Sequence, residues 1–184
     1  MTILGDKAQT VDDRMQDVLR FIPKLLGKDM RRIEMNRSYR NTLEIAEYAR
    51  RISGIKGIEY VNRHGKEVEE RGYVSWVDVA DQILTEVKLG EDGYETAAVL
   101  TMTEEEALGL YSMLKEKRED VSYIDRDSSK FKKGITVTTF YMAKGLEFDQ
   151  VFVVGGEADN PFYKQFQYIS ATRALHELYV LKKS

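Results

Sequence analysis

Cysteine is absent from the 184-residue sequence, and histidine and proline occur only twice each. A chain without cysteine cannot contain disulfides, a thiol nucleophile or a zinc ribbon, and two histidines are too few for a histidine-based metal cluster. No metal site is therefore expected. A basic charge is lacking as well, because the formal net charge is −3 and the sequence pI is about 5.6. Dedicated nucleic-acid binders are usually basic, so the charge argues against strong DNA binding by this chain alone.

Long apolar runs are also missing. No run approaches the ~20 residues that span a bilayer, and the N-terminal residues MTILGDKAQ lack the charged start and apolar stretch of a signal peptide. The expectation is a cytoplasmic protein with no membrane partner. Hydrophobic residues make up 42% of the sequence and charged residues 32%, which favours a globular chain over a disordered one.

Short β-branched runs alternate with amphipathic helical segments along the chain. This alternation predicts an α/β domain with a mainly parallel sheet flanked by helices. Val151–Val154 is apolar throughout, which is typical of a central parallel strand buried on both faces. The charged stretch 63–71, with Gly65 inside it and Gly72 after it, predicts a turn or hairpin. The expected strands are Arg31–Met35, Ile58–Asn62, Thr96–Thr101, Val121–Asp125, Ile135–Phe140, Gln150–Val154 and Glu177–Leu181.

Helix boundaries can be predicted from capping residues. Thr103 and Glu106 form the clearest capping box, and Ser75 with Asp78 resembles another. Gly54 stands where a helix beginning near Leu43 would end. A further helix is expected near the N-terminus, where apolar side chains recur at helical spacing at Val11, Met15, Val18, Ile22, Leu25 and Leu26.

Four segments carry residues suited to binding phosphates or sugars, and each is ambiguous by itself: Gly5–Gln9, Asn36–Thr42, Thr136–Asp149 and Tyr168–Ala174. Arg40, at a predicted helix N-terminus, is unfavourable for the helix dipole unless an anion lies nearby, although a solvated arginine would look the same. Hydroxyls and Gly145 at the carboxyl end of a strand suit phosphate contacts; the alternative is a half-exposed strand and a helical turn. Arg173, on a predicted amphipathic helix, lies either close to a phosphate or simply at the surface.

Taken together and in this order, the four segments resemble motifs III, IV, V and VI of superfamily 1 helicases of the UvrD/Rep type. GDKAQ (residues 5–9) is similar to motif III, SYRNT (38–42) to motif IV, TTFYMAKGLEF (138–148) to motif V and YISATRA (168–174) to motif VI. The P-loop and the acidic metal-binding motif of this family, which lie upstream of motif III, are absent from the sequence. The resemblance therefore implies that residues 1–10 end a first RecA-like domain. Residues 11–184 would form the second, a RecA-like domain without its own P-loop.

The resemblance also implies how a nucleotide would be bound. ATP with Mg²⁺, both held mainly by the first RecA-like domain, would lie in the cleft between the two domains. Tyr39 would stack on the adenine, Glu147 would hold the ribose, and Gly145 would let the backbone approach the nucleotide. Arg40 and Arg173 would act as arginine fingers that stabilise charge on the γ-phosphate in the transition state.

Contacts with single-stranded DNA are implied for a different set of residues. Gln9 would couple the γ-phosphate to the nucleic-acid track, where Thr139 and Tyr141 would meet strand phosphates. Three features depart from the family pattern. Motif V usually carries a histidine at the position of Tyr141, and no aromatic residue follows Gln9 to stack on a base. The stretch between Arg40 and Thr136 is too short for the large extra domain of UvrD-like enzymes.

This layout without a large inserted domain is similar to the HelD group, which is related to helicase IV and acts on RNA polymerase. Two alternatives therefore remain open. The chain is either half of an ATP-driven DNA translocase, or half of a HelD-like motor that remodels or recycles RNA polymerase. A third alternative, a stand-alone adaptor without an ATPase partner domain, is disfavoured because an adaptor has no use for the paired arginines Arg40 and Arg173.

Overall fold

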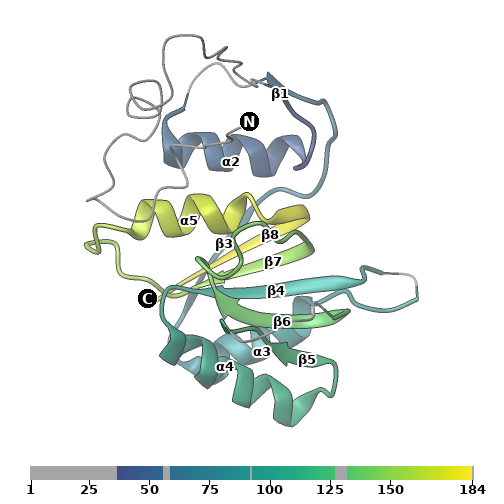
Figure 1. The fold of residues 1–184 in the computed structure, drawn as a ribbon, viewed down its shortest axis with the longest axis vertical. Helices are drawn as coiled ribbons and strands as arrows, with labels where there is room; N and C mark the ends of the chain where they lie inside the picture. Colours follow the sequence, from purple (N-terminus) through teal and green to yellow (C-terminus); the bar gives the residue numbers. More distant parts are fainter. Residues whose placement is uncertain (1–36, 56–58, 92, 127–131, 184) are drawn as a thin grey trace, which may run out of the picture.

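A six-stranded parallel β-sheet forms the centre of the molecule (Figure 1). The computed structural model describes residues 37–55, 59–91, 93–126 and 132–183. Within these residues the strand order is β3-β8-β7-β4-β6-β5, and every neighbouring pair is parallel. The strands are β3 (Glu69–Tyr73), β4 (Thr96–Thr101), β5 (Val121–Tyr123), β6 (Gly134–Thr139), β7 (Phe148–Val154) and β8 (Ala174–Lys183). The expected α/β fold with a mainly parallel sheet is confirmed.

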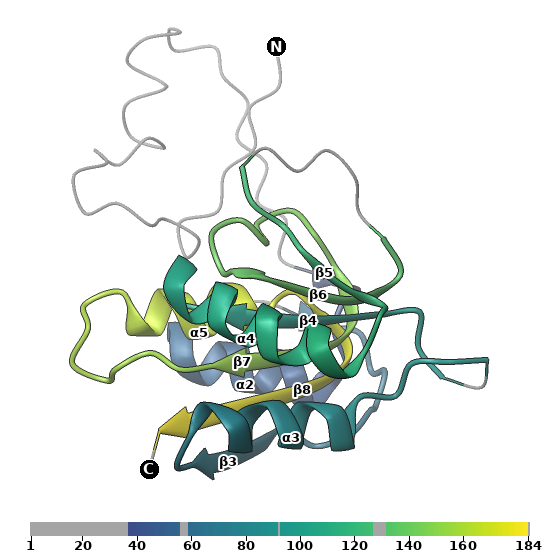
Figure 2. The ribbon, with the colours of Figure 1, turned by 90° about the horizontal axis from the view of Figure 1, so that it is seen from below.

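Helices cover both faces of the sheet (Figures 1 and 2). One face carries α2 (Leu43–Ser53) and α5 (Tyr163–Ala171), and the other carries α3 (Trp76–Glu86) and α4 (Glu104–Lys117). Because side chains alternate along a strand, each face has its own apolar core. Val153 packs in the core under α2 and α5, whereas its neighbour Val154 packs in the core under α3 and α4. A short parallel pair, β1 (Arg37–Ser38) and β2 (Glu59–Tyr60), forms a separate sheet.

The central strand confirms one sequence expectation, and the edge strand corrects another. β7 lies between β8 and β4, and its residues Val151–Val154 are buried as predicted. The prediction of a turn or hairpin over 63–71 is wrong in its second half, where Glu69–Tyr73 forms β3 at the edge of the sheet. The sequence did not predict this strand because its residues are mostly charged. Glu70 and Arg71 find ion-pair partners around the edge, where polar residues are tolerated.

Helix ends follow the capping chemistry that the sequence indicates. Thr103 and Glu106 make both bonds of the capping box at the start of α4. The hydroxyl of Ser75 caps α3 by accepting from the backbone N–H of Asp78. Gly54 ends α2 with a φ of 66°, in the left-handed region that glycine adopts at no steric cost.

Several N-terminal expectations lie outside the described residues. They are the helix over residues 11–26, the strand Arg31–Met35, motif III with Gln9, and the domain boundary at residue 10. Among the residues that the structure describes, no helix is long and apolar enough to cross a membrane.

Candidate functional site

The loop between β6 and β7 runs from the carboxyl ends of the parallel strands to their amino ends. β6 ends with Thr139 at the carboxyl edge of the strands, and β7 begins with Phe148 at the amino edge. Residues 140–147 therefore run from one edge to the other. The site residues predicted from motif V are divided between them, with Tyr141 following the carboxyl edge and Glu147 directly preceding the amino edge. The expectation of ligand contacts at the carboxyl end of a strand thus concerns only the first half of this motif.

An ion pair joins Arg40 to Glu147 near the amino edge. Arg40 Nε lies 2.6 Å from Glu147 Oε1, and the two side chains are 42% and 41% exposed. Arg40 precedes α2, and a helix N-terminus disfavours a cation unless an anion compensates it. Glu147 supplies that anion. The structure therefore brings together one residue from motif IV and one from motif V that the resemblance assigns to the same nucleotide.

Arg173 lies beside this pair, but not in the expected setting. α5 ends at Ala171, so Arg173 stands in the turn before β8 rather than on the helix, and it is only 2% exposed. Its Nη1 donates to the carbonyl of Leu146 at 3.3 Å, and its Nε donates to the carbonyl of Ile169 at 3.2 Å. The alternative of a simple surface arginine on a helix is wrong, because Arg173 follows α5 and its guanidinium is buried against the carbonyls of Leu146 and Ile169. Figure 1 shows α5 lying between α2 and the sheet.

Tyr39 and Gly145 complete the group of predicted nucleotide residues. Tyr39 is 66% exposed. Gly145 has a φ of 93°, which residues with a Cβ rarely adopt, and no described atom lies within 4 Å of the position that a Cβ would take. The backbone at this position is therefore both dependent on glycine and open to approach. We call the following residues the amino-edge cluster: Tyr39, Arg40, Gly145, Glu147 and Arg173.

Two side chains outside the predicted set attach the loop before α2 to the start of β8. Asn41 Nδ2 donates to the carbonyl of Ala174 at 2.5 Å. Arg63 Nη2 donates to the carbonyl of Arg40 at 2.5 Å and to that of Leu175 at 2.6 Å. Sequence reasoning missed both contacts. Asn41 lies inside motif IV, which was a usable signal, whereas Arg63 lies in a charged stretch where nothing distinguishes it from its neighbours.

Thr139 and Tyr141 lie at the carboxyl edge, away from the amino-edge cluster. Thr139 is 1% exposed, so its hydroxyl is not accessible to a ligand in this conformation. The Tyr141 hydroxyl donates to Glu104 Oε1 at 2.7 Å, and burial together with this carboxylate raises the pKa of Tyr141. A groove of about 520 Å³ runs beside it, lined by Met102, Thr103, Arg126, Phe140, Tyr141, Asn160 and Phe162.

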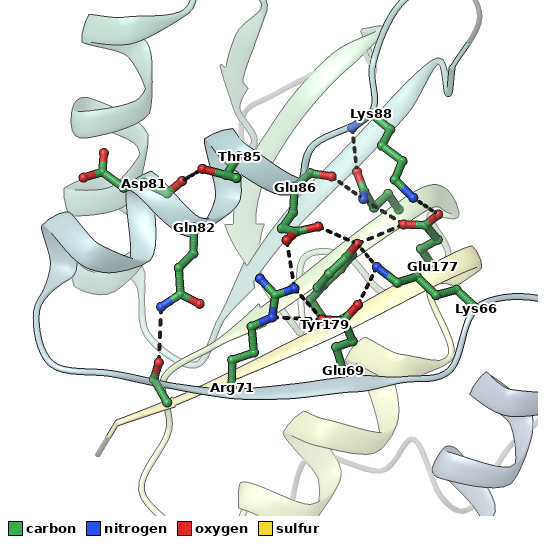
Figure 3. A network of polar contacts seen from close by, with 12 residues as sticks. Lys66, Glu69, Arg71, Asp81, Gln82, Thr85, Glu86, Lys88, Glu177 and Tyr179 are labelled. Carbon is green, nitrogen blue, oxygen red and sulfur yellow. Dashed lines mark hydrogen bonds and ion pairs between the residues drawn. The ribbon is translucent and has the colours of Figure 1, made fainter.

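A polar network on the α3 side of the sheet attaches α3 to β3 and β8 (Figure 3). Glu177, which is 6% exposed, accepts from Lys88 Nζ at 2.5 Å and from the Tyr179 hydroxyl at 3.1 Å. Burial acts to raise the pKa of Glu177, but these bonds hold it below its ordinary value. Arg71 pairs with Glu86 at 2.8 Å. The buried carboxylate of Glu177 is thus paired, as a buried charge must be, and the network links α3 to β3 and β8. In the described part of the chain, no group of three or more acidic, histidine or cysteine side chains is placed to hold a metal ion.

Comparison with known protein families matches the C-terminal part of the chain. Residues 134–181 match the UvrD-like helicase C-terminal domain. The matched segment extends from β6 into β8 and includes Thr139, Tyr141, Gly145, Glu147 and Arg173, while motif IV precedes it. No curated protein sequence matches the chain significantly.

A solved helicase domain shares this fold. The C-terminal domain of a possible DNA helicase from Lactobacillus plantarum WCFS1 is similar with a TM-score of 0.61 and 26% identity, covering 79% of this chain and 87% of that one. The arterivirus helicase nonstructural protein 10 in complex with DNA gives 0.41 and 17%, covering 61% of this chain and 28% of that one. Dbp5 of S. cerevisiae, bound to RNA and ADP BeF3, gives 0.43 and 14%, covering 76% and 41%. The parallel sheet with its flanking helices is the fold of RecA-like helicase domains.

Proposed function

We propose that this chain is the C-terminal motor domain of an ATP-dependent DNA helicase or translocase of superfamily 1. It would supply Arg40 and Arg173 to ATP that is held, with Mg²⁺, mainly by a first RecA-like domain. The amino-edge cluster carries the proposal, because residues from motifs IV, V and VI meet there around Leu146 and Glu147. The match of residues 134–181 and the similarity to the C-terminal domain of a possible DNA helicase support the helicase class and the choice of DNA.

Two guanidinium groups at one edge suit the negative charge that must be stabilised during phosphoryl transfer. The pair between Arg40 and Glu147 is partly exposed, and such pairs contribute only ~0–1 kcal/mol. Phosphate oxygens can therefore replace the carboxylate at Arg40 at small cost. Arg173 is only 2% exposed, so its guanidinium would reach phosphate only if the chain around Leu146 moves when the nucleotide binds. Until then its bond to the carbonyl of Leu146 orients it.

The rest of the amino-edge cluster suits the other parts of a nucleotide. When Arg40 turns to phosphate, the Glu147 carboxylate becomes available to accept hydrogen bonds from ribose hydroxyls. The open backbone at Gly145 allows close approach, and the exposed ring of Tyr39 can stack on adenine.

Single-stranded DNA would follow the carboxyl edge, beside Tyr141 and the groove that it lines. The loop over residues 140–147 joins the two edges in one continuous segment. A displacement of Glu147 on nucleotide binding would reach Tyr141 through this loop. Through this connection, ATP hydrolysis would change the affinity of the domain for the DNA strand.

A protein target, RNA polymerase in a HelD-like motor, is the second candidate. Glu104 and Glu105 are exposed in the first turn of α4 at the carboxyl edge, and Tyr141 bonds to Glu104. Carboxylates beside a strand phosphate repel it, which makes this edge less suited to DNA. Strand displacement on a tailed duplex, run beside a pull-down of RNA polymerase with the protein that carries both motor domains, separates the two. Unwinding without polymerase association supports the helicase, and the reverse supports the second candidate.

Arg173→Ala in the protein that carries both motor domains tests the main proposal. ATP turnover should fall by ~10³–10⁵-fold while ATP binding is largely retained, because an arginine finger acts in the transition state. Arg40→Ala should behave similarly. Arg173→Lys should not restore turnover, because an ammonium group lacks the planar fork of a guanidinium. Arg118→Ala, which removes a pair with Asp120 at the far end of α4, is the matched control. Near-normal turnover by Arg173→Ala would refute the proposal.

A further inference from the structure

We infer that Arg63 is a positioning residue that fixes Arg40 relative to Arg173; this inference rests on the proposed function of these two arginines. Arg63 lies between β2 and β3, outside the predicted motifs. Its Nη2 atom donates to the carbonyl of Arg40 at 2.5 Å and to the carbonyl of Leu175 at 2.6 Å. One guanidinium nitrogen therefore links the backbone of one finger to the strand that begins directly after the other.

The backbone around Arg63 is itself attached to the start of α2. The carbonyl of Arg63 accepts from Leu43 N at 2.9 Å, which satisfies one of the N–H groups that a helix leaves unpaired in its first turn. The carboxylate of Glu44 accepts from Gly65 N at 2.8 Å and contacts His64 Nδ1 at 2.9 Å. Residues 63–65 are thus attached to the start of α2, and from there the Arg63 side chain reaches β8. We call these three residues the 63–65 clamp.

The contacts of Arg63 explain why it acts through other residues. Its Nη2 is bonded to the main-chain carbonyls of Arg40 and Leu175, so this cation fixes the backbone on both sides, and it lies outside the segments that the resemblance assigns to the nucleotide. Hydrogen bonds from a charged donor are roughly twice as strong as neutral ones. Asn41 adds a second link to Ala174, so loss of Arg63 should loosen the arrangement without separating the segments. A displacement of about 1 Å at a reacting group can reduce turnover about 10²-fold.

Because both acceptors of Arg63 are carbonyl oxygens, one substitution can distinguish its role from that of Arg173. Two carbonyl oxygens can both accept from one lysine ammonium, which carries three donors. Arg63→Lys should therefore retain most of the function of Arg63. At Arg173, lysine should fail because recognition of phosphate there needs the fork. The opposite responses of the two sites to the same replacement distinguish a positioning arginine from a finger.

The test uses Arg63→Ala, Arg63→Lys and the control Arg50→Ala, an exposed arginine on α2. In the 184-residue chain, amide hydrogen exchange by NMR should become faster at residues 41–43 and 174–176 in Arg63→Ala, and remain unchanged in Arg50→Ala. In the protein that carries both motor domains, Arg63→Ala should lower kcat for ATP by about 10–10²-fold with little change in KM. Arg63→Lys should restore both readouts.

The outcomes separate this inference from the proposed function. Unchanged kcat in Arg63→Ala, together with lost turnover in Arg173→Ala, overturns the positioning role of Arg63. The proposed roles of Arg40 and Arg173 would then remain. Normal turnover in Arg173→Ala overturns both. If Arg63→Ala fails to fold, Arg63→Lys decides: native exchange with a kcat that is still low overturns the inference, and native exchange with restored kcat supports it.

Discussion

Arg40 and Glu147 form an ion pair across two motifs, with Nε and Oε1 2.6 Å apart. Arg40 precedes α2 and Glu147 precedes β7, so only the folded sheet brings them together. In the proposed function, a nucleotide would replace this pair by offering phosphate to the arginine and hydroxyls to the carboxylate. Its partial exposure keeps this exchange inexpensive in free energy.

Glu147→Gln should therefore barely change the stability of the chain. An exposed pair contributes at most about 1 kcal/mol, so the free energy of unfolding in urea should change by no more than this amount. Glu95→Gln, which removes the exposed pair with Lys133, is the matched control and should behave alike. A much larger loss in Glu147→Gln alone would mean that Arg40 is held structurally and is not available to a nucleotide.

The isolated chain should hydrolyse no ATP and bind it weakly. The P-loop and the acidic metal-binding motif supply most contacts to the phosphates and Mg²⁺ in such motors, and the sequence contains neither. Calorimetric titration with Mg-ATP measures the affinity directly. Micromolar binding by this chain would contradict a nucleotide site shared between two domains.

Gly65→Ala should destabilise the chain by about 1–3 kcal/mol, as overpacking does. A Cβ at Gly65 would lie 2.5 Å from Cγ2 of Thr42, a buried residue at the start of α2. Threonine is β-branched and stiff, so the 63–65 clamp or the helix must shift. Gly109→Ala in α4 meets no described atom within 4 Å, and it should stabilise by about 0.5–1 kcal/mol because alanine favours helix. Equal unfolding midpoints in urea would contradict this packing.

Acid should weaken the attachment of β3 to α3. The hydrogen bond from Arg71 lowers the pKa of Glu86 below its ordinary 4.5, and bonds from Lys66 and Arg71 do the same for Glu69. A carboxyl whose pKa is lower in the folded state stabilises above the unfolded value, and this contribution disappears as the pH falls through the folded pKa. The free energy of unfolding should therefore drop as the pH falls below 4.5.

Glu86→Gln measures the part of this drop that comes from Glu86. The variant should be less stable than the parent at neutral pH, and the difference should shrink in acid, because the parent then loses the same charge. Urea unfolding at several pH values gives both quantities. Glu157→Gln, at an exposed position outside the helices and strands, serves as the control. A difference that is constant with pH would show that the charge of Glu86 is not responsible.

Local patterns in the sequence predicted the elements that depend on neighbours in the chain. The capping box of Thr103 and Glu106, the end of α2 at Gly54 and the strand Thr96–Thr101 occur where the sequence placed them. These features involve contacts a few residues apart, so the residue types reveal them. The order of the four segments that resemble helicase motifs was equally visible, because it lies in the sequence itself.

The tertiary structure alone decided which of these elements meet. It placed Glu69–Tyr73 at the sheet edge, where ion pairs compensate charges that had concealed a strand. It buried Arg173 against the carbonyls of Leu146 and Ile169, and it divided the motif V segment between opposite edges of the sheet. It also selected Arg63 from among many similar charged residues. Such contacts depend on the order of the strands in the sheet and on how far a side chain reaches across the fold. Neither can be read from the order of residues along the chain.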